Sequence, residues 1–136
     1  MAITKSDILA NLQKIDFVDL PYLRKVIQAL ATDSVTVETL TASGAVSTDT
    51  TVLNLDHTSV AIAATLDVSS LYGDFTVRAT TEPGVAADHT LTVSGGTLDG
   101  TNTVATFADI NDSLTINFDG AGTGTIISNI GAVVLS

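Results

Sequence analysis

The spacing of hydrophobic and polar residues changes once along this chain, near residue 34. Before that point apolar residues recur every three or four positions, which is the spacing of one face of an α-helix. The pattern predicts two short helices, at about 6–15 and 20–31, separated by the sequence DFVDLP. Helices of this length are marginal in water on their own, so each needs a surface to pack against.

The second predicted helix carries an apolar stripe with basic neighbours. An amphipathic stripe of this kind packs either on the chain's own sheet or on another subunit. We expect residues 1–34 to form a helical N-terminal arm that contacts a partner or a neighbouring subunit, and we keep packing on the chain's own sheet as the alternative. The expected contact residues are Leu20, Leu23, Arg24, Lys25, Ile27 and Leu30.

After residue 34 apolar and polar residues alternate with a period of two, which is the pattern of half-buried β-strands. The clearest case is DSLTINFDG, where Leu114, Ile116 and Phe118 should point inward. Similar alternation sets apart Val35 and Val37, Val60 and Ile62, Phe75 and Val77, and Leu91 and Val93, while Leu53 and Leu55 belong to a further short strand.

About eight such strands are separated by corners rich in Gly, Asp, Asn and Ser, at a spacing of roughly 8–12 residues. They predict an all-β domain at 35–136, an antiparallel β-sandwich or jelly-roll-like barrel, preceded by the short helical arm at 1–34. No pattern of helical length interrupts the strands, so a parallel α/β architecture is not expected.

Two stretches of this region look alike. DHTSVAIAATLD, at 56–67, and DHTLTVSGGTLD, at 88–99, share six of twelve positions. Their hydrophobic alternation differs in phase by one residue, and a slip of one residue turns every side chain of a strand to the opposite face. We therefore interpret the likeness as coincidence rather than as a duplicated hairpin.

Charge is distributed unevenly over these two regions. Residues 1–34 are neutral overall, whereas residues 35–136 hold one basic residue, Arg78, against eleven acidic ones and carry the whole net charge of −10. Such a surface repels phosphate backbones, so no nucleic-acid partner is expected. Because charged residues make up only 15% of the chain and hydrophobic residues 45%, we expect some surface to be hidden in an oligomer.

Three corners of the chain, LDGTN, DINDS and FDGAG, are rich in aspartate and could be read as a cation site. DINDS lacks the glycine and the glutamate of an EF-hand loop, and FDGAG offers Asp119 alone. Asp-Gly is instead a strong hairpin-turn signal, because both turn positions tolerate positive φ. The corners are expected to be turns, with no metal and no cofactor, and an incidental surface cation is the alternative.

The chain offers little catalytic chemistry. It has no cysteine, its two histidines both lie in the sequence DHT, and no GxSxG elbow or phosphate-binding loop is present. His57 and His89 are expected at turns or strand ends, and the chain is not expected to be an enzyme. No uninterrupted apolar run approaches the roughly 18–20 residues of a membrane span, so no membrane partner is expected.

The C-terminal run GTLDGTNTVATFADINDSLTINFDGAGTGTIISNIGAVVLS, at 96–136, resembles the closing segment of small virion proteins of tailed bacteriophages. In those proteins a DGTNxTAT turn and strand precedes an ending of the form aLxxxFdxxGxgtivsNxGxvxLS. Upstream, LDHTSVAIAATL at 55–66 is similar to their apolar AIAATL strand. The resemblance covers most of 50–136, includes nothing in 1–34, and transfers no catalytic residues.

This resemblance implies an all-β capsid decoration (cement) protein, usually a homotrimer, that braces the head shell. The implied partners are the major capsid protein and further copies of the chain, and the implied location is the capsid surface of the virion after synthesis in the host cytoplasm. The alternative is a tail-fibre or receptor-binding module whose DGTN and DINDS loops contact host glycans.

Overall fold

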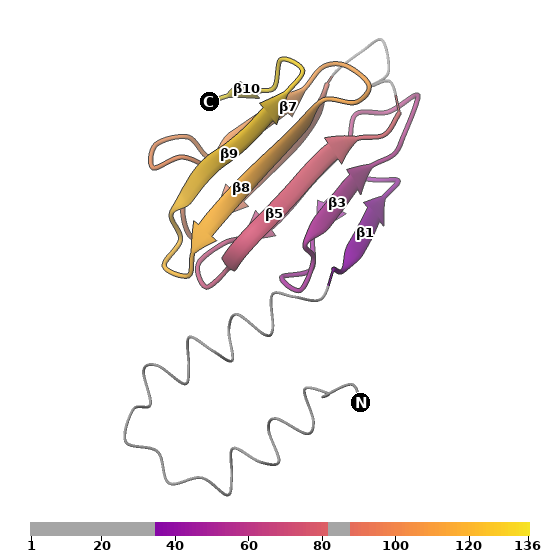
Figure 1. The fold of residues 1–136 in the computed structure, drawn as a ribbon. Helices are drawn as coiled ribbons and strands as arrows, with labels where there is room; N and C mark the ends of the chain where they lie inside the picture. Colours follow the sequence, from indigo (N-terminus) through magenta and orange to yellow (C-terminus); the bar gives the residue numbers. More distant parts are fainter. Residues whose placement is uncertain (1–34, 82–87) are drawn as a thin grey trace, which may run out of the picture. The chain divides into compact units, whose positions relative to one another are not determined.

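The computed structural model describes residues 35–81 and 88–136, which form an all-β unit (Figure 1). These residues contain ten strands and no helix. The strands are β1 (Val37–Leu40), β2 (Gly44–Ala45), β3 (Val52–Leu55), β4 (Ala63–Asp67), β5 (Tyr72–Ala79), β6 (His89–Ser94), β7 (Val104–Phe107), β8 (Ser113–Asp119), β9 (Gly124–Ile130) and β10 (Val134–Leu135).

The strands form two five-stranded sheets that pack together. The first sheet has the order β1-β3-β5-β8-β9 and the second has the order β10-β7-β6-β4-β2. From β1 to β6 the chain alternates between the sheets, so each pair of strands makes one turn of a flattened coil. Successive turns run in the same direction, and the strands β1, β3 and β5 are therefore parallel neighbours, as are β2, β4 and β6.

This topology corrects the predicted strand directions. The pairs β5–β8, β8–β9, β6–β7 and β7–β10 are antiparallel, but the pairs among the first six strands are parallel, so both sheets are mixed. Two mixed sheets packed together remain consistent with a β-sandwich. The direction was missed because alternation of buried and exposed residues signalled antiparallel strands, whereas parallel sheets usually have both faces covered.

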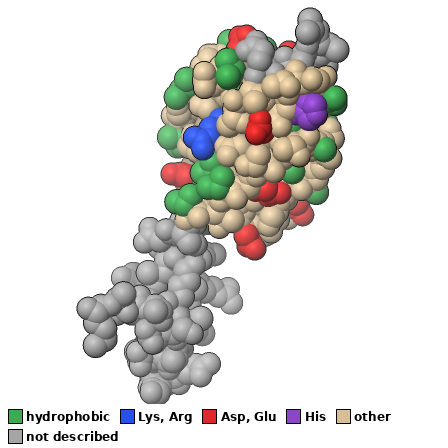
Figure 2. Space-filling view, turned by 90° about the vertical axis from the view of Figure 1, so that its right-hand side faces the viewer, with side chains coloured by type: hydrophobic (Ala, Val, Ile, Leu, Met, Phe, Trp, Pro, Cys, Tyr) green, Lys and Arg blue, Asp and Glu red, His purple; other side chains and the backbone are tan. Residues whose placement is uncertain are grey.

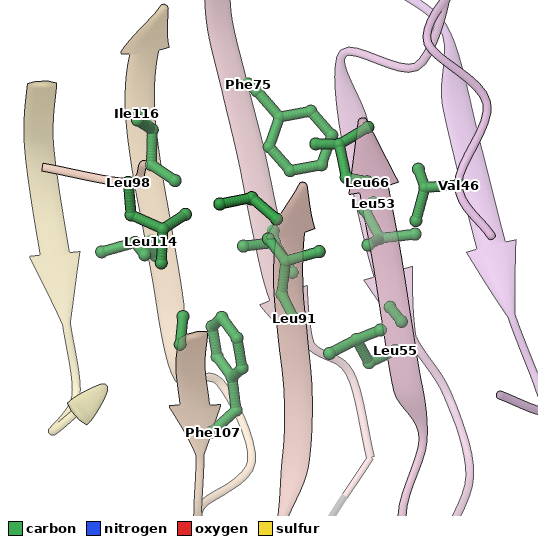
Figure 3. Close-up of a cluster of buried hydrophobic side chains, with 14 of the residues drawn as sticks. Val46, Leu53, Leu55, Leu66, Phe75, Leu91, Leu98, Phe107, Leu114 and Ile116 are labelled. Carbon is green, nitrogen blue, oxygen red and sulfur yellow. The ribbon is translucent and has the colours of Figure 1, made fainter. Parts of the chain in front are cut away.

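The core lies between the two sheets (Figure 3). Phe75 and Phe118 reach it from the first sheet and Phe107 reaches it from the second, each with 1% or less of its surface exposed. Burying a side chain of this size is worth about 1.5–3 kcal/mol relative to exposure. The remaining buried apolar residues are Val46, Leu53, Leu55, Ile62, Ala64, Leu66, Val68, Val77, Ala79, Leu91, Val93, Leu98, Ala105, Leu114, Ile116 and Val133.

The inward phase is confirmed for the strand with the clearest alternation, since Leu114, Ile116 and Phe118 are all fully buried. The predicted inward pairs in β5 and β6 and the two leucines of β3 are buried as well.

Three valines that the alternation grouped with inward positions are instead exposed: Val35, Val37 and Val60, at 74%, 56% and 59%. In the edge strand β1 the opposite face points inward: Leu40 packs against the core, and the Glu38 side chain accepts the N–H of Ser47 at 3.0 Å. Val60 precedes β4 and lies in a turn, where its N–H donates to Nδ1 of His57 at 3.0 Å.

The two similar stretches lie side by side but do not occupy equivalent positions. Strand β4 pairs with β6 so that Ala64 lies beside Leu91 and Leu66 lies beside Val93, an offset of 27 residues. The sequence likeness has an offset of 32 residues. It is therefore not the structural repeat of this fold.

The predicted helices at about 6–15 and 20–31 lie outside the described residues, and both they and the domain boundary after residue 34 stay predictions.

Candidate functional site

Asp99, in the corner LDGTN, closes a turn with its own carboxylate. Its Oδ1 accepts the N–H groups of Thr101 and Asn102 at 3.0 and 2.7 Å, and its Oδ2 accepts the side-chain amide of Asn102 at 2.8 Å. Hydrogen bonds from Asn102 and Thr101 hold the pKa of Asp99 below its ordinary value, because they stabilise the ionised carboxylate.

Asp119 closes the corner FDGAG in the same way. Its Oδ1 accepts the N–H groups of Ala121 and Thr123 at 2.7 and 3.0 Å. These two backbone donors, with Ala121 the stronger, lower the pKa of Asp119. The interpretation of LDGTN and FDGAG as turns is confirmed by these contacts.

The corner DINDS is organised around Asp112, which is only 3% exposed. Its Oδ2 accepts the N–H groups of Ala108 and Asp109, each at 3.1 Å, and its Oδ1 lies 3.4 Å from the N–H of Ala132. Asp112 thereby connects the loop between β7 and β8 with the turn between β9 and β10. Both segments cross from one sheet to the other, so this carboxylate helps to hold the sheets in register.

These contacts leave the aspartate corners poorly suited to a cation. A metal ion needs several carboxylate or carbonyl oxygens directed at one point, but here backbone N–H groups, the positive ends of peptide dipoles, point at the carboxylates. Within residues 35–81 and 88–136, no group of three or more His, Cys, Asp or Glu side chains could hold a metal ion.

His89 is the one buried histidine among the described residues. It begins β6 opposite Phe107, and its Nδ1 accepts the N–H of Ile62 at 3.0 Å. Its Nε2 is buried without a hydrogen-bond partner. Burial lowers the pKa of His89, and the nearby charge of His57 acts in the same direction, while Asp88 opposes the shift.

Neither histidine has the geometry of a general base. In His57, as in His89, Nδ1 accepts backbone N–H groups, here those of Ser59 and Val60 at 3.0 Å. In the neutral ring the proton must then sit on Nε2, which can donate a hydrogen bond but cannot take up a proton from a substrate. Both residues lie at a turn or strand end, as expected, but the burial of His89 was not anticipated.

Polar side chains on the outer face of the first sheet hydrogen-bond to one another. On the side of the unit that Figure 2 shows, acidic side chains are scattered rather than gathered into one patch. Arg78, the only basic residue of the described ranges, donates from Nε to Asn54 at 2.6 Å, and Asn54 donates to Thr39 at 3.3 Å. Further pairs on this face are Asn117 with Asp74, at 2.7 Å, and Thr76 with Thr115, at 3.0 Å. These hydrogen bonds join side chains of neighbouring strands.

The edge formed by β9 and β10 has a different character. Ile127, Ile130 and Val134 are 59–60% exposed there, and the sequence from Gly120 to Ser136 contains no charged side chain. The alternation of residues in this run does not predict its exposed apolar side chains. The lack of charge over so long a segment, in a chain with a net charge of −10, was the signal that could have identified them.

The predicted contact residues Leu20, Leu23, Arg24, Lys25, Ile27 and Leu30 lie outside the described residues. The described part of the chain has no helix of the length and hydropathy that a membrane crossing requires. No model of a known protein family matches the sequence, and no curated protein matches it either.

Proposed function

We propose that this chain is a virion structural protein, a capsid decoration protein that binds the outer surface of a bacteriophage head shell and stabilises it as a homotrimer. In this proposal residues 35–136 form a β-sandwich that contacts the shell and neighbouring copies, and residues 1–34 form an attachment arm. The partners are the major capsid protein and other copies of the chain.

The observation that carries the proposal is the resemblance of residues 96–136 to the closing segment of tailed-phage virion proteins. The residues that define this likeness have specific structural roles here. Asp99 and Asn102 of DGTN close a turn on each other. Asn129 of SNIG donates to the carbonyl of Val133 at 3.0 Å and so joins β9 to β10. These residues of the resembling segment form a turn and join two strands, which supports the proposal that the resemblance reflects a common local fold.

The chemistry of the described residues supports a structural role. The aspartates accept backbone N–H groups of turns, the histidines accept backbone N–H groups, and polar side chains on the first sheet hydrogen-bond to one another. A protein that braces a shell needs a rigid scaffold of this kind and requires no cofactor.

Rebinding to stripped shells tests the proposal. Head shells are freed of the protein with mild denaturant, mixed with the purified full chain, and heated while rupture is followed by light scattering. We expect saturable binding and a rise in the rupture temperature of several degrees. Shells that neither bind the chain nor gain stability would contradict the proposal.

The contact residues of the arm are tested in the same assay. Leu23→Asp places a charge in the apolar stripe and should weaken binding about tenfold or more, since buried apolar anchors dominate interfaces. Gln28→Asp adds the same charge beside the stripe and serves as the matched control. Equal effects of the two substitutions would argue against attachment through this stripe.

A further inference from the structure

Strand β9 forms one edge of the first sheet. On its inner side it pairs with β8, and a bulge at Ile127 interrupts the register between Thr115 and Ile116. A bridge between Thr97 and Thr123, just before the strand, and the hydrogen bond from the N–H of Gly124 to the carbonyl of Thr97 pair only the start of β9. From Thr125 to Ile130 the described residues place no further strand beside it.

An edge strand presents unpaired backbone N–H and C=O groups, which pair readily with another strand. Proteins usually protect such edges with lysine, proline or inward-pointing charge. β9 has none of these residues, and β10 follows after only three residues without adding any charge. The bulge at Ile127 is the one protective feature, and it leaves the stretch from Ser128 to Ile130 available.

The exposed side chains of this edge are apolar and β-branched. Ile127 and Ile130 on β9 and Val134 on β10 lie within eight positions of one another and are each more than half exposed. Full burial of each of these side chains would contribute about 1.5–3 kcal/mol of stabilisation, which is absent while they are exposed to water. The edge therefore has both the hydrogen-bonding groups and the apolar surface of an interface.

We propose that the β9–β10 edge is the seam through which copies of this chain associate, strand against strand. Two copies with a net charge of −10 repel each other wherever acidic side chains meet. The segment from Gly120 to Ser136 is the longest uncharged run of the β region, so copies approach there with the least repulsion. A basic partner would instead favour the acidic turns.

A second copy also offers partners for this edge. Its own β9 has an equivalent row of unpaired backbone groups that can pair with the first, and its isoleucines can pack against the same isoleucines of the first copy. The inference deepens the proposed function and rests on its oligomeric state, but it does not depend on attachment to a shell. The two can therefore fail separately.

Sedimentation equilibrium of the full chain tests the seam. The doubly substituted protein Ile127→Lys, Ile130→Lys places like charges in the edge and should weaken self-association at least about a hundredfold, roughly tenfold for each side chain. Val37→Lys, on the opposite edge strand β1 and similarly exposed at 56%, is the control and should associate as the unchanged chain does. Ile127→Thr, Ile130→Thr keeps β propensity and provides a second variant if the lysines disturb folding.

Amide hydrogen exchange gives an independent readout. Backbone amides of residues 125–130 should exchange more slowly in the oligomer than in a dilute monomer. An oligomer that resists both double substitutions, or one that Val37→Lys weakens equally, overturns the seam while leaving the decoration role intact. A chain that stays monomeric at about 100 µM overturns the seam and the oligomeric part of the proposed function together, whereas shell binding is decided by the rebinding assay.

Discussion

The carboxylate of Asp112 occupies the space that a β-carbon on residue 131 would need. Residue 131 is a glycine with a φ of 85°, a conformation that other residues rarely adopt. This contact sits where two crossovers between the sheets meet, the loop before β8 and the turn after β9. The pairing of an acid with a glycine 19 positions later is thus part of what holds the sheets together.

Gly131→Ala should therefore lower the free energy of unfolding by about 2–5 kcal/mol. About 1–2 kcal/mol comes from the positive φ, and roughly 1–3 kcal/mol comes from displacing the packed carboxylate. Gly100→Ala is the matched control, because Gly100 has a φ of 90° but no atom within 4 Å of the added carbon. Urea unfolding of both variants checks the difference. Equal losses would show that the Asp112 contact contributes nothing.

The burial of His89 predicts a pH dependence. Its pKa in the folded state lies below the ordinary value of 6.5, so the unfolded chain binds more protons as the pH falls toward and below that value. Stability is then fully present above about pH 6.5 and is lost as the pH falls through the folded pKa. Protonation would also end the hydrogen bond from Ile62 to Nδ1.

Thermal melting between pH 7.5 and 5 should show this loss in the unchanged chain and a flatter profile in His89→Gln. His57→Gln, at the half-buried histidine between β3 and β4, removes only the second cause of the His89 shift, so part of the slope should remain. The turn aspartates act in a separate window, because their lowered pKa values confer stability that is lost only as the pH falls below about 3.8. If the pH dependence of the melting temperature persists in His89→Gln, it arises from the titration of another group.

Metal removal should leave the protein unchanged. If the carboxylates of Asp99, Asp112 and Asp119 accept hydrogen bonds from backbone N–H groups instead of binding a metal ion, a chelator has no metal-bound protein to act on. The melting temperature measured with EDTA and with added calcium should agree within error. A fall of several degrees with EDTA that calcium restores would make these corners a cation site.

Truncation separates the roles of the two regions. Residues 35–136 contain every described strand and the whole described core, so this segment alone should retain a β-type circular dichroism spectrum. It should also keep the self-association expected of the β9–β10 edge but lose binding to stripped shells. An unfolded segment would place residues 1–34 in the core, and a segment that still binds shells would remove the attachment role of the arm.

Much of the fold was predictable because alternation reports burial directly. Leu114, Ile116 and Phe118 follow a strict period of two in a central strand, and all three are buried. The same period places His89 in phase with Leu91 and Val93, which would have predicted its burial had the preceding aspartate not suggested a turn. The turns at Asp99 and Asp119 were predictable because Asx side chains bind backbone N–H groups a few residues onward.

Other features depended on long-range contacts that a local pattern does not contain. Alternation gives β1 two faces but does not say which one points inward. The inward face is the one with Glu38, whose carboxylate accepts hydrogen bonds from the backbone of Ser47 and the hydroxyl of Thr50. Parallel pairing of β1 with β3 arises because β2 lies in the opposite sheet, which no single strand reveals. The exposed edge at β9 likewise depends on which strand ends the sheet.

Cryo-electron microscopy of intact particles tests the central claim most directly. A decoration protein should appear as repeated density on the outer surface of the head, at every equivalent position of the capsid lattice, into which the two five-stranded sheets fit with the β9–β10 edge at the contact between copies. Density for the same fold at the tail, in a few copies, would contradict the account and favour the receptor-binding alternative. Particles that lack the chain altogether would contradict both.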